Sequence, residues 1–263
     1  MGYIGLENKK ILIVEDVELN QFLVRHILES WGCLVEVVEN GALALESMNR
    51  KNFDLVLMDI QMPVMDGIEA TKEIRKLKDP VKATIPIIAL TANAIRGDCT
   101  DFINAGMNDC LPKPFEEAAL FEIISENIKI NKAISMNVLS ERADQVAVPA
   151  LKMYDLSMVE TISGGDKTFV VKMLQLFLDT VPASLKEMSA ASGKKDWAEL
   201  SRLAHKLKST IDSMGIAEVQ QTIRVMESNG KSGNNAEALP ALVGQVVETM
   251  EAVMAQVRKD HSL

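Results

Sequence analysis

The sequence predicts two domains of different fold class, an α/β domain built on a parallel sheet followed by an all-α antiparallel bundle. Two observations predict this organisation. In the first half, short apolar runs of strand length alternate with amphipathic segments, a pattern typical of a parallel sheet with helices on both faces. From Met153 onward there are only long amphipathic segments with short polar breaks, which is typical of helices packed in a bundle. A chain of 263 residues is long enough for both domains.

The composition of one internal segment separates the two patterns. Residues 131–152 combine scattered Ser, Asn, Gln and charged residues with weak periodicity, and Pro149 lies near the end of the segment. This composition is typical of a linker. We therefore expect an α/β domain over residues 1–130, a linker over 131–152 and a helical bundle over 153–263.

The strands of the first domain are expected in four largely apolar runs, at residues 10–14, 34–39, 53–58 and 85–90, and in the segment 108–111. The helices expected after them cover residues 17–31, 41–50, 67–77, 93–105 and 116–129. Glu36 interrupts the second run, so we expect that strand at an edge of the sheet. We expect the flavodoxin-like strand order 2-1-3-4-5, in which strands one and three are neighbours at the switch point of the doubly wound sheet.

Amphipathic periodicity predicts five helices in the second domain, at residues 158–163, 167–192, 196–214, 216–229 and 236–259. Asp166 and Asp196 stand directly before the second and third of these helices and are favourable N-cap residues. Gly193 is expected to end the second helix and Gly215 the third.

Charged residues lie at the ends of buried strands in the first domain. Glu15 and Asp16 follow strand one, and Asp59 follows strand three. If these strands are neighbours, their carboxyl ends bring the three carboxylates together at one rim of the sheet. Such carboxylates repel one another unless a cation lies among them, and Mg²⁺ favours oxygen ligands of this kind.

Two further polar side chains are expected at the same rim. Thr91 follows strand four, and Lys113, which precedes Pro114, follows strand five. Together with the acid pair and Asp59, this succession resembles the receiver domain of two-component signalling, over residues 9–131. A solvated acid at a strand end is the alternative for Asp59 alone, and the matching residues at the other strand ends favour a functional role.

The resemblance implies a role for each residue of this set. Asp59 would accept a phosphoryl group from a phosphohistidine. Mg²⁺ would be held by Asp16, Asp59 and the backbone carbonyl of Gln61, with Glu15 acting through water. The resemblance also implies that Lys113 and Thr91 contact phosphoryl oxygens. Cys110 stands where many receivers have Tyr or Phe, which argues against a strong Thr–aromatic switch.

A second candidate site lies on the predicted helix 196–214. Its apolar stripe consists of Leu200, Leu203, Leu207, Ile211 and Met214. His205 is expected on the opposite face, together with Lys208 and Ser209. The segment around His205 resembles the motif of histidine phosphotransfer (HPt) domains, over residues 151–260, except that Ser209 replaces the usual Gly. The resemblance implies that His205 carries a phosphoryl group through an exposed ring nitrogen, with Lys208 as a nearby cation. An idle, exposed helix histidine is the alternative.

Composition excludes several other classes of function. A net charge of −9 argues against nucleic acid as a partner. The cysteines, Cys33, Cys99 and Cys110, are odd in number and form no C-x-x-C, so we expect neither zinc nor a disulfide framework, and a reducing cytosol is the natural compartment. No apolar stretch reaches the roughly 18 residues of a membrane helix and no signal-peptide pattern is present, so we expect a soluble, cytoplasmic chain without membrane contact.

The two resemblances together predict a phosphorelay protein. Its partners would be a sensor histidine kinase that donates the phosphoryl group and a downstream receiver that accepts it, and the chain would be a fragment or a partner of a hybrid kinase. No glycine-rich ATP site is found, so the receiver would catalyse only its own phosphorylation. Two alternatives remain: a module in which phosphorylation controls binding and the bundle docks a partner without phosphotransfer, and a flavodoxin-like enzyme with a cofactor. The acidic rim and the missing glycine-rich phosphate loop disfavour the enzyme.

Overall fold

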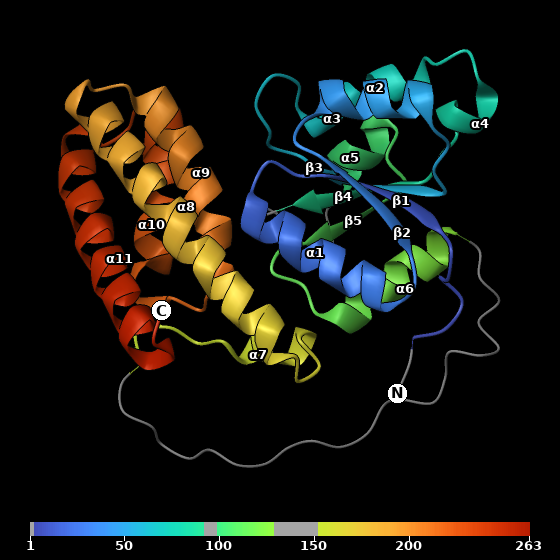
Figure 1. Cartoon of the computed structure of the whole chain (residues 1–263). Coiled ribbons are helices and arrows are strands. Elements are labelled where there is room, and N and C mark those ends of the chain that lie inside the picture. Colours follow the sequence, from blue (N-terminus) through green and yellow to red (C-terminus); the bar gives the residue numbers. More distant parts are fainter. Residues whose placement is uncertain (1–2, 92–98, 129–151) are drawn as a thin grey trace. The chain divides into compact units, whose positions relative to one another are not determined.

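A computed structural model of the chain describes residues 3–91, 99–128 and 152–263 (Figure 1). The chain divides into two compact units, Met1–Val146 and Ala147–Leu263. The predicted linker, residues 131–152, lies outside the described residues except for Lys152, as does most of the first half of the predicted helix 93–105. The domain boundaries drawn from the sequence therefore stay predictions.

The first unit is built on a five-stranded sheet in the order β2-β1-β3-β4-β5, with every neighbouring pair parallel. The strands are β1 (Lys10–Val14), β2 (Leu34–Val38), β3 (Leu55–Asp59), β4 (Ile87–Thr91) and β5 (Asp109–Pro112). The predicted order and the edge position of β2 are confirmed. The last strand residues of β3 and β4 are Asp59 and Thr91, one residue beyond the predicted ends, because both residues still pair with the neighbouring strand.

The helices of this unit are α1 (Glu18–Ser30), α2 (Gly41–Arg50), α3 (Gly67–Arg75), α4 (Pro80–Ala83), α5 (Thr100–Ala105) and α6 (Glu117–Asn127). The sequence did not predict α4, a single turn that begins with Pro80. Proline suits the first helical position, and the Asp79 side chain accepts a hydrogen bond from the backbone N–H of Val81 at 2.9 Å.

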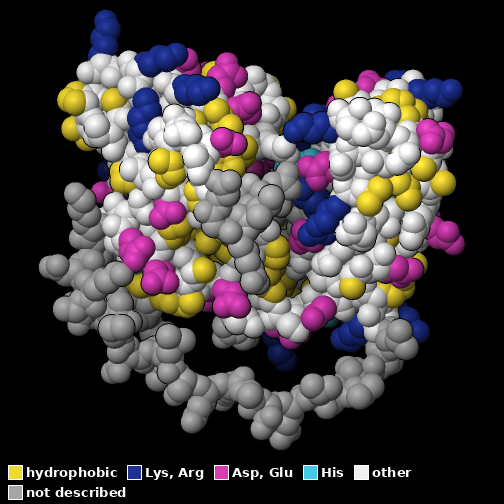
Figure 2. All heavy atoms as spheres, turned by 180° about the vertical axis from the view of Figure 1, so that it is seen from behind, with side chains coloured by type: hydrophobic (Ala, Val, Ile, Leu, Met, Phe, Trp, Pro, Cys, Tyr) yellow, Lys and Arg dark blue, Asp and Glu magenta, His cyan; other side chains and the backbone are white. Residues whose placement is uncertain are grey.

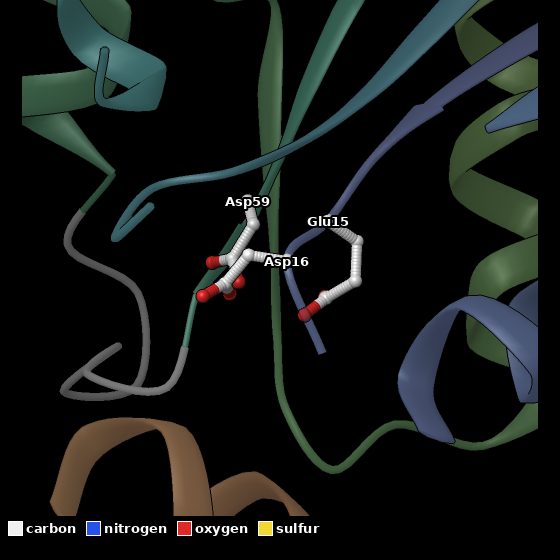
Figure 3. A group of neighbouring side chains, drawn as sticks. All are labelled: Glu15, Asp16 and Asp59. Atoms are coloured by element: carbon white, nitrogen blue, oxygen red, sulfur yellow. The ribbon is translucent and has the colours of Figure 1, made fainter. Parts of the chain in front are cut away.

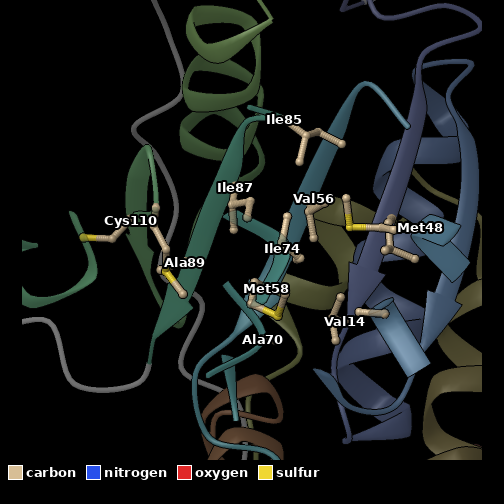
Figure 4. Close-up of a cluster of buried hydrophobic side chains, with 13 residues drawn as sticks. Val14, Met48, Val56, Met58, Ala70, Ile74, Ile85, Ile87, Ala89 and Cys110 are labelled. Atoms are coloured by element: carbon tan, nitrogen blue, oxygen red, sulfur yellow. The ribbon is translucent and has the colours of Figure 1, made fainter. Parts of the chain in front are cut away.

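Alternate strand residues face one core of the first unit (Figure 4). Its buried members come from β1, β3, β4 and β5 and from α2 and α3, and include Val14, Met48, Val56, Met58, Ala70, Ile74, Ile87, Ala89 and Cys110. Helices α2 and α3 therefore cover this face of the sheet, whereas α1 and α6 lie on the other side of the sheet in Figure 1. Burial of both faces explains why the strands are continuous apolar runs.

The second unit contains α7 (Ser157–Ile162), α8 (Lys167–Gly193), α9 (Trp197–Ser213), α10 (Ala217–Ser232), a short 3-10 turn (Ala236–Ala238) and α11 (Leu239–His261). Asp166 and Asp196 cap α8 and α9 as predicted, each accepting a backbone N–H. The prediction placed Gly193 just after the last residue of this helix. In the structure Gly193 is itself the last residue of α8. Buried apolar residues along α8, α9, α10 and α11 form the core of this unit.

Two helices of the second unit are long and apolar enough to cross a membrane by length and composition alone, Lys167–Gly193 and Ala236–His261. A core helix of a soluble bundle has the same properties, so this finding is weak by itself. Of the most apolar stretch in each helix, 33% and 39% of the residues are buried inside the unit. On the face shown in Figure 2, Lys and Arg side chains are interspersed with Asp and Glu side chains over both units.

The cysteines differ from the sequence expectation. Cys99, the residue that precedes α5, and Cys110, on β5, are joined as a disulfide with their Cα atoms 6.0 Å apart. Cys33 is free and buried. The expectation of no disulfide was wrong because strand and helix packing brings together two cysteines that are 11 residues apart in the sequence.

Candidate functional site

Three carboxylates meet at the carboxyl ends of β1 and β3 (Figure 3). Glu15 and Asp16 directly follow β1, and Asp59 is the last residue of β3. One oxygen from each of the three lies within 4.8 Å of the others. The pairing of β1 with β3 places these strand ends side by side, so the predicted convergence of the three acids is confirmed.

The carboxylate of Asp59 is fixed by its own backbone surroundings. Its Oδ1 accepts hydrogen bonds from the backbone N–H of Ile60 at 2.7 Å and of Gln61 at 3.4 Å. Gly67, the first residue of α3, approaches so closely that a Cβ added there would lie 2.1 Å from the backbone oxygen of Asp59. Glycine at this position is therefore what lets α3 begin directly against the strand end that carries Asp59.

Lys113 lies between two of the acids. Its Nζ is 2.5 Å from Glu15 Oε2 and 3.0 Å from Asp59 Oδ2. Burial alone would lower the pKa of Lys113, but Asp59 and Glu15 outweigh this effect and raise it above its ordinary value. The ammonium group therefore stays charged and balances part of the negative charge at the rim.

Glu15 is the most deeply buried acid of the three, and its side chain is fully enclosed. Burial raises the pKa of Glu15 to about 7, an effect that the nearby charge of Lys113 opposes and that of Asp59 reinforces. Its Oε1 accepts hydrogen bonds from the backbone N–H of Val17 and from the side chain of Asn20, both at 3.1 Å. Asn20 on α1 positions Glu15, and in the sequence it is only a polar residue on a helix face.

Thr91 and Lys113 reach the same rim from β4 and from the chain after β5. Thr91 is buried and pairs with Pro112, and its backbone oxygen accepts the backbone N–H of Lys113 at 2.7 Å. The backbone pairing of β4 with the end of β5 therefore holds Thr91 next to Lys113. The metal-binding role predicted for the backbone carbonyl of Gln61 stays a prediction.

The donor set at this rim fits a hard divalent cation. Glu15, Asp16 and Asp59 offer only oxygen atoms, in a cluster compact enough for one ion to reach all three. The three carboxylates face one ammonium group, so part of their negative charge is left for a cation to balance. The described residues thus form a site that can hold a metal ion.

The second candidate site lies between α9 and α10. His205 Nδ1 on α9 is 2.6 Å from Glu227 Oε1 on α10, and Lys208 Nζ is 2.5 Å from Glu227 Oε2. The side chain of His205 is 14% exposed and that of Lys208 only 2%. We expected the face opposite the apolar stripe to be exposed. It is instead largely covered, because α10 packs against it. Ser209 on this face is buried as well.

Glu227, the acid that contacts both His205 and Lys208, was not singled out from the sequence. Burial would raise its pKa, but hydrogen bonds from His205 and Lys208 and their charges outweigh burial and lower it to about 2. Within the described part of the chain, His205 Nε2 has no hydrogen-bond partner. The imidazole is thus oriented through Nδ1, and Nε2 is the ring nitrogen left for chemistry.

A further ion pair lies next along the same two helices. Asp212 on α9 receives two hydrogen bonds from Arg224 Nη2 on α10, at 2.8 and 2.9 Å. The charge of Lys208 also acts on Asp212, where it lowers the pKa of the carboxyl against the larger opposing effect of burial.

Comparison with protein-family models gives two matches. Residues 11–125 match the response regulator receiver domain, and residues 172–259 match the Hpt domain. Asp59, Thr91 and Lys113 fall within the first match, and His205, Lys208 and Glu227 within the second.

Several longer proteins resemble almost the whole chain. The signal transduction histidine-protein kinase BarA of Escherichia coli (strain K12) is 29% identical over 249 residues, which are 95% of this chain and 27% of that protein. The aerobic respiration control sensor protein ArcB of the same strain is 31% identical over 255 residues, 95% of this chain and 30% of that protein. The sensor histidine kinase GacS of Pseudomonas protegens is 30% identical over 89% of this chain and 25% of that protein. The chain therefore spans less than a third of these relatives.

Among solved structures, the receiver domain of sensor histidine kinase PA1611 from Pseudomonas aeruginosa PAO1 is 43% identical to this chain. The match covers 47% of this chain and 99% of that domain, with a TM-score of 0.43. That crystal structure has a magnesium ion coordinated in its active-site cleft.

Proposed function

Because the chain belongs to the phosphorelay proteins that join a response regulator receiver domain to an Hpt domain, we propose that Asp59 and His205 carry the phosphoryl group in it. The observation that carries this proposal is the position of Lys113. Its ammonium group contacts Asp59 Oδ2 at 3.0 Å, where a phosphoryl group on that oxygen would add negative charge. The matched families agree with those predicted from the motifs.

At the receiver site, the proposed step is attack of Asp59 on the phosphorus of a phosphohistidine. Backbone N–H groups occupy Oδ1, so Oδ2 is the oxygen that forms the new P–O bond, while the P–N bond breaks and the imidazole leaves. Lys113, which already contacts Oδ2, would form an ion pair with one phosphoryl oxygen. The Thr91 hydroxyl would donate a hydrogen bond to another phosphoryl oxygen. These residues act by position and charge, which is how most phosphoryl-transfer sites work.

We further propose that the metal ion is Mg²⁺. Asp16, Asp59 and the carbonyl of Gln61 would hold it directly, and Glu15 through water. Mg²⁺ keeps several waters when it binds carboxylates, and it supplies positive charge against phosphoryl oxygens. Lys113 leaves a net negative charge on the three acids, so this cation would complete the charge balance of the rim.

At the bundle site, the proposed nucleophile is His205 Nε2. Glu227 accepts a hydrogen bond from the N–H of Nδ1, which keeps the proton on Nδ1 and the lone pair on Nε2, and its negative charge stabilises the positive charge that develops on the ring. Nε2 would attack the phosphorus of an aspartyl phosphate, the P–O bond would break, and the aspartate carboxylate would be restored. The bundle offers few other polar groups at this point, so a receiver would supply the remaining charge stabilisation.

The proposed partners are a sensor histidine kinase as donor of the phosphoryl group and a receiver domain as its acceptor. A cytoplasmic location is proposed with them, because a kinase phosphohistidine and a second receiver must both be reached. The chain would serve as the relay portion of a hybrid kinase or as a separate partner of one.

Radiolabelled phosphoryl transfer tests the proposal. The full chain, with Mg²⁺, is given a small acyl phosphate donor that labels aspartate, and each label is typed by its stability. Wild type should gain base-labile label on Asp59 and then acid-labile, base-stable label on His205. Asp59→Asn should gain neither, and His205→Gln only the base-labile label.

The control is His26→Gln, which alters a histidine on α1 of the receiver and should leave both labels in place. If Asp59 is labelled normally and no acid-labile label ever forms from any donor receiver, His205 is not a carrier. The chain would then be a receiver with a helical docking domain.

A further inference from the structure

Cys99 and Cys110 form a cross-link inside the receiver unit. Cys99 is the N-cap residue of α5, and Cys110 is the second residue of β5. Their sulfur atoms are bonded and their Cα atoms are 6.0 Å apart, a spacing at which disulfides ordinarily form. The backbone therefore presents the two thiols to each other without rearrangement.

The cross-link lies close in sequence to two residues of the phosphoryl site. Cys110 is three residues before Lys113, and Cys99 follows Thr91 with residues 92–98 between them. In the ladder, Cys110 pairs with Ala89 and Pro112 pairs with Thr91. The disulfide thus ties Cys99, at the start of α5, to the strand that leads to Lys113.

Cys33 provides the contrast. It is 6% exposed, and its sulfur donates to the backbone oxygen of Leu6 at 3.4 Å. Burial raises the pKa of the Cys33 thiol to about 11, helped by Glu7 and Asp54, so it is a poor nucleophile. Cys99 is half-buried and more open to a small oxidant than Cys110, which is 9% exposed in the core (Figure 4).

We propose that Cys99 and Cys110 are a reversible redox pair, oxidised by a peroxide and reduced by a dithiol, whose state sets how readily Asp59 is phosphorylated. Disulfides of cytosolic proteins are mostly transient and redox-sensing, and this pair is poised for that use. The effect on Asp59 rests on the proposed function, whereas the formation of the pair does not.

The chemistry balances with a peroxide as oxidant. The Cys99 thiolate attacks one peroxide oxygen, the O–O bond breaks, and Cys99 becomes a sulfenic acid while water or an alcohol leaves. Cys110 then attacks the sulfenic sulfur, the S–O bond breaks, and water leaves with the thiol proton as the S–S bond forms. The two thiols lose two electrons and two protons, which the peroxide gains.

The consequence for Asp59 follows from where the cross-link acts. Phosphorylation requires the Thr91 hydroxyl and the Lys113 ammonium group to move into contact with the oxygens of the new phosphoryl group. With the disulfide formed, Cys99 at the start of α5 is tied covalently to Cys110 on β5, three residues before Lys113; as two thiols, this covalent tie is absent. Oxidation should therefore slow phosphorylation of Asp59.

Differential alkylation of the full chain tests the pairing. The reduced protein is treated with hydrogen peroxide, free thiols are blocked with light N-ethylmaleimide, and the thiols released by reduction are labelled with the heavy form. Peptide mass spectrometry should find Cys99 and Cys110 heavy together and Cys33 light. In Cys99→Ser, whose serine suits an N-cap position, Cys110 should stay light. The pairing would be overturned if Cys110 carried as much heavy label in that variant as in the wild type. It would also be overturned if Cys99 and Cys110 of the wild type carried no more heavy label than Cys33.

The second arm measures the rate of Asp59 phosphorylation by a small acyl phosphate with Mg²⁺. We expect the oxidised wild type to react at least about fivefold more slowly than the reduced protein, the lower range of coupling between two sites. Peroxide should not change the rate in Cys99→Ser. Equal rates in both wild-type states would overturn the coupling. No phosphorylation in either state would count against the proposed function and remove the coupling with it, while alkylation still decides the pairing.

Discussion

Glu227 serves two groups of α9 with its two carboxylate oxygens. One oxygen accepts from His205 Nδ1 and the other from Lys208 Nζ, so a single half-buried acid orients the imidazole and neutralises the ammonium group. Removing its charge would leave Lys208 buried without a counterion, which is costly in a low-dielectric interior. Orientation of the ring and stability of the bundle therefore depend on the same side chain.

Glu227→Gln should slow phosphoryl transfer to His205 by about 10-fold or more, the usual cost of losing a group that orients a functional histidine. The amide still accepts a hydrogen bond but no longer stabilises the positive ring. Single-turnover transfer from a phosphorylated receiver measures the rate, and the ring ¹⁵N shifts report the tautomer. The control is Glu218→Gln, at an exposed position of α10, which should change neither. An unchanged rate with an altered tautomer would contradict the role.

Bundle stability should fall in acid through the same carboxylate. The pKa of Glu227 is about 2 in the fold and 4.5 ordinarily, so between these values the unfolded chain binds more protons and stability rises with pH. The contribution is complete above about pH 5 and is lost toward pH 2; it is at most about 3 kcal/mol. The free-energy difference between wild type and Glu227→Gln in urea unfolding should shrink as the pH falls. A difference independent of pH would refute the assignment.

At the scale of elements, α3 is fixed at both ends. Gly67 brings its start against Asp59, and Arg75 at its end donates to the backbone oxygens of Gly106, Ala83 and Ile85 and to the side chain of Asn108, at 2.7 to 3.0 Å. A planar guanidinium spreads five N–H donors over three nitrogens, whereas an ammonium group has three donors on a single nitrogen. Arg75 therefore joins two connecting segments, the one that leads into β4 and the one that leads into β5.

Arg75→Lys should destabilise the receiver unit by about 2 kcal/mol, because at least two buried backbone oxygens lose their donors. Urea unfolding followed by tryptophan fluorescence measures the loss. Arg50→Lys, the same exchange at an exposed position of α2, should cost nothing measurable. Equal stability of the two variants would show that water replaces the lost hydrogen bonds.

The sequence predicted what depends on local pattern and on strand order. Both faces of the sheet are buried, so its strands are apolar runs, and the polar residues at their ends, such as Asp59 and Lys113, stand out. Glu227 could not be found in this way, because one helix pattern does not show how a second helix is rotated against it. The same holds for Cys99 and Cys110, which only tertiary packing brings together, and for the burial of Lys208.

At the scale of the whole molecule, each unit has its own core and its own tryptophan. Trp31 belongs to the receiver unit, where its ring packs on Tyr3 and Phe121, and Trp197 is the first residue of α9. Variants with one tryptophan replaced by Phe therefore report each unit separately. We propose that the segments 1–130 and 153–263 unfold as two transitions, since each unit holds its own buried apolar cluster.

These two probes allow a test of metal binding on the full chain. Mg²⁺ should stabilise the transition seen by Trp31, in Trp197→Phe, by about 1.4 kcal/mol at ten times its Kd, because it binds only the folded acidic site. The transition seen by Trp197, in Trp31→Phe, should not move, and a chelator should reverse the effect. Asp59→Asn should reduce the shift, because one of the three carboxylates is lost, whereas His205→Gln should keep it. A shift of equal size in both units would mean that Mg²⁺ acts by general screening rather than at Glu15, Asp16 and Asp59.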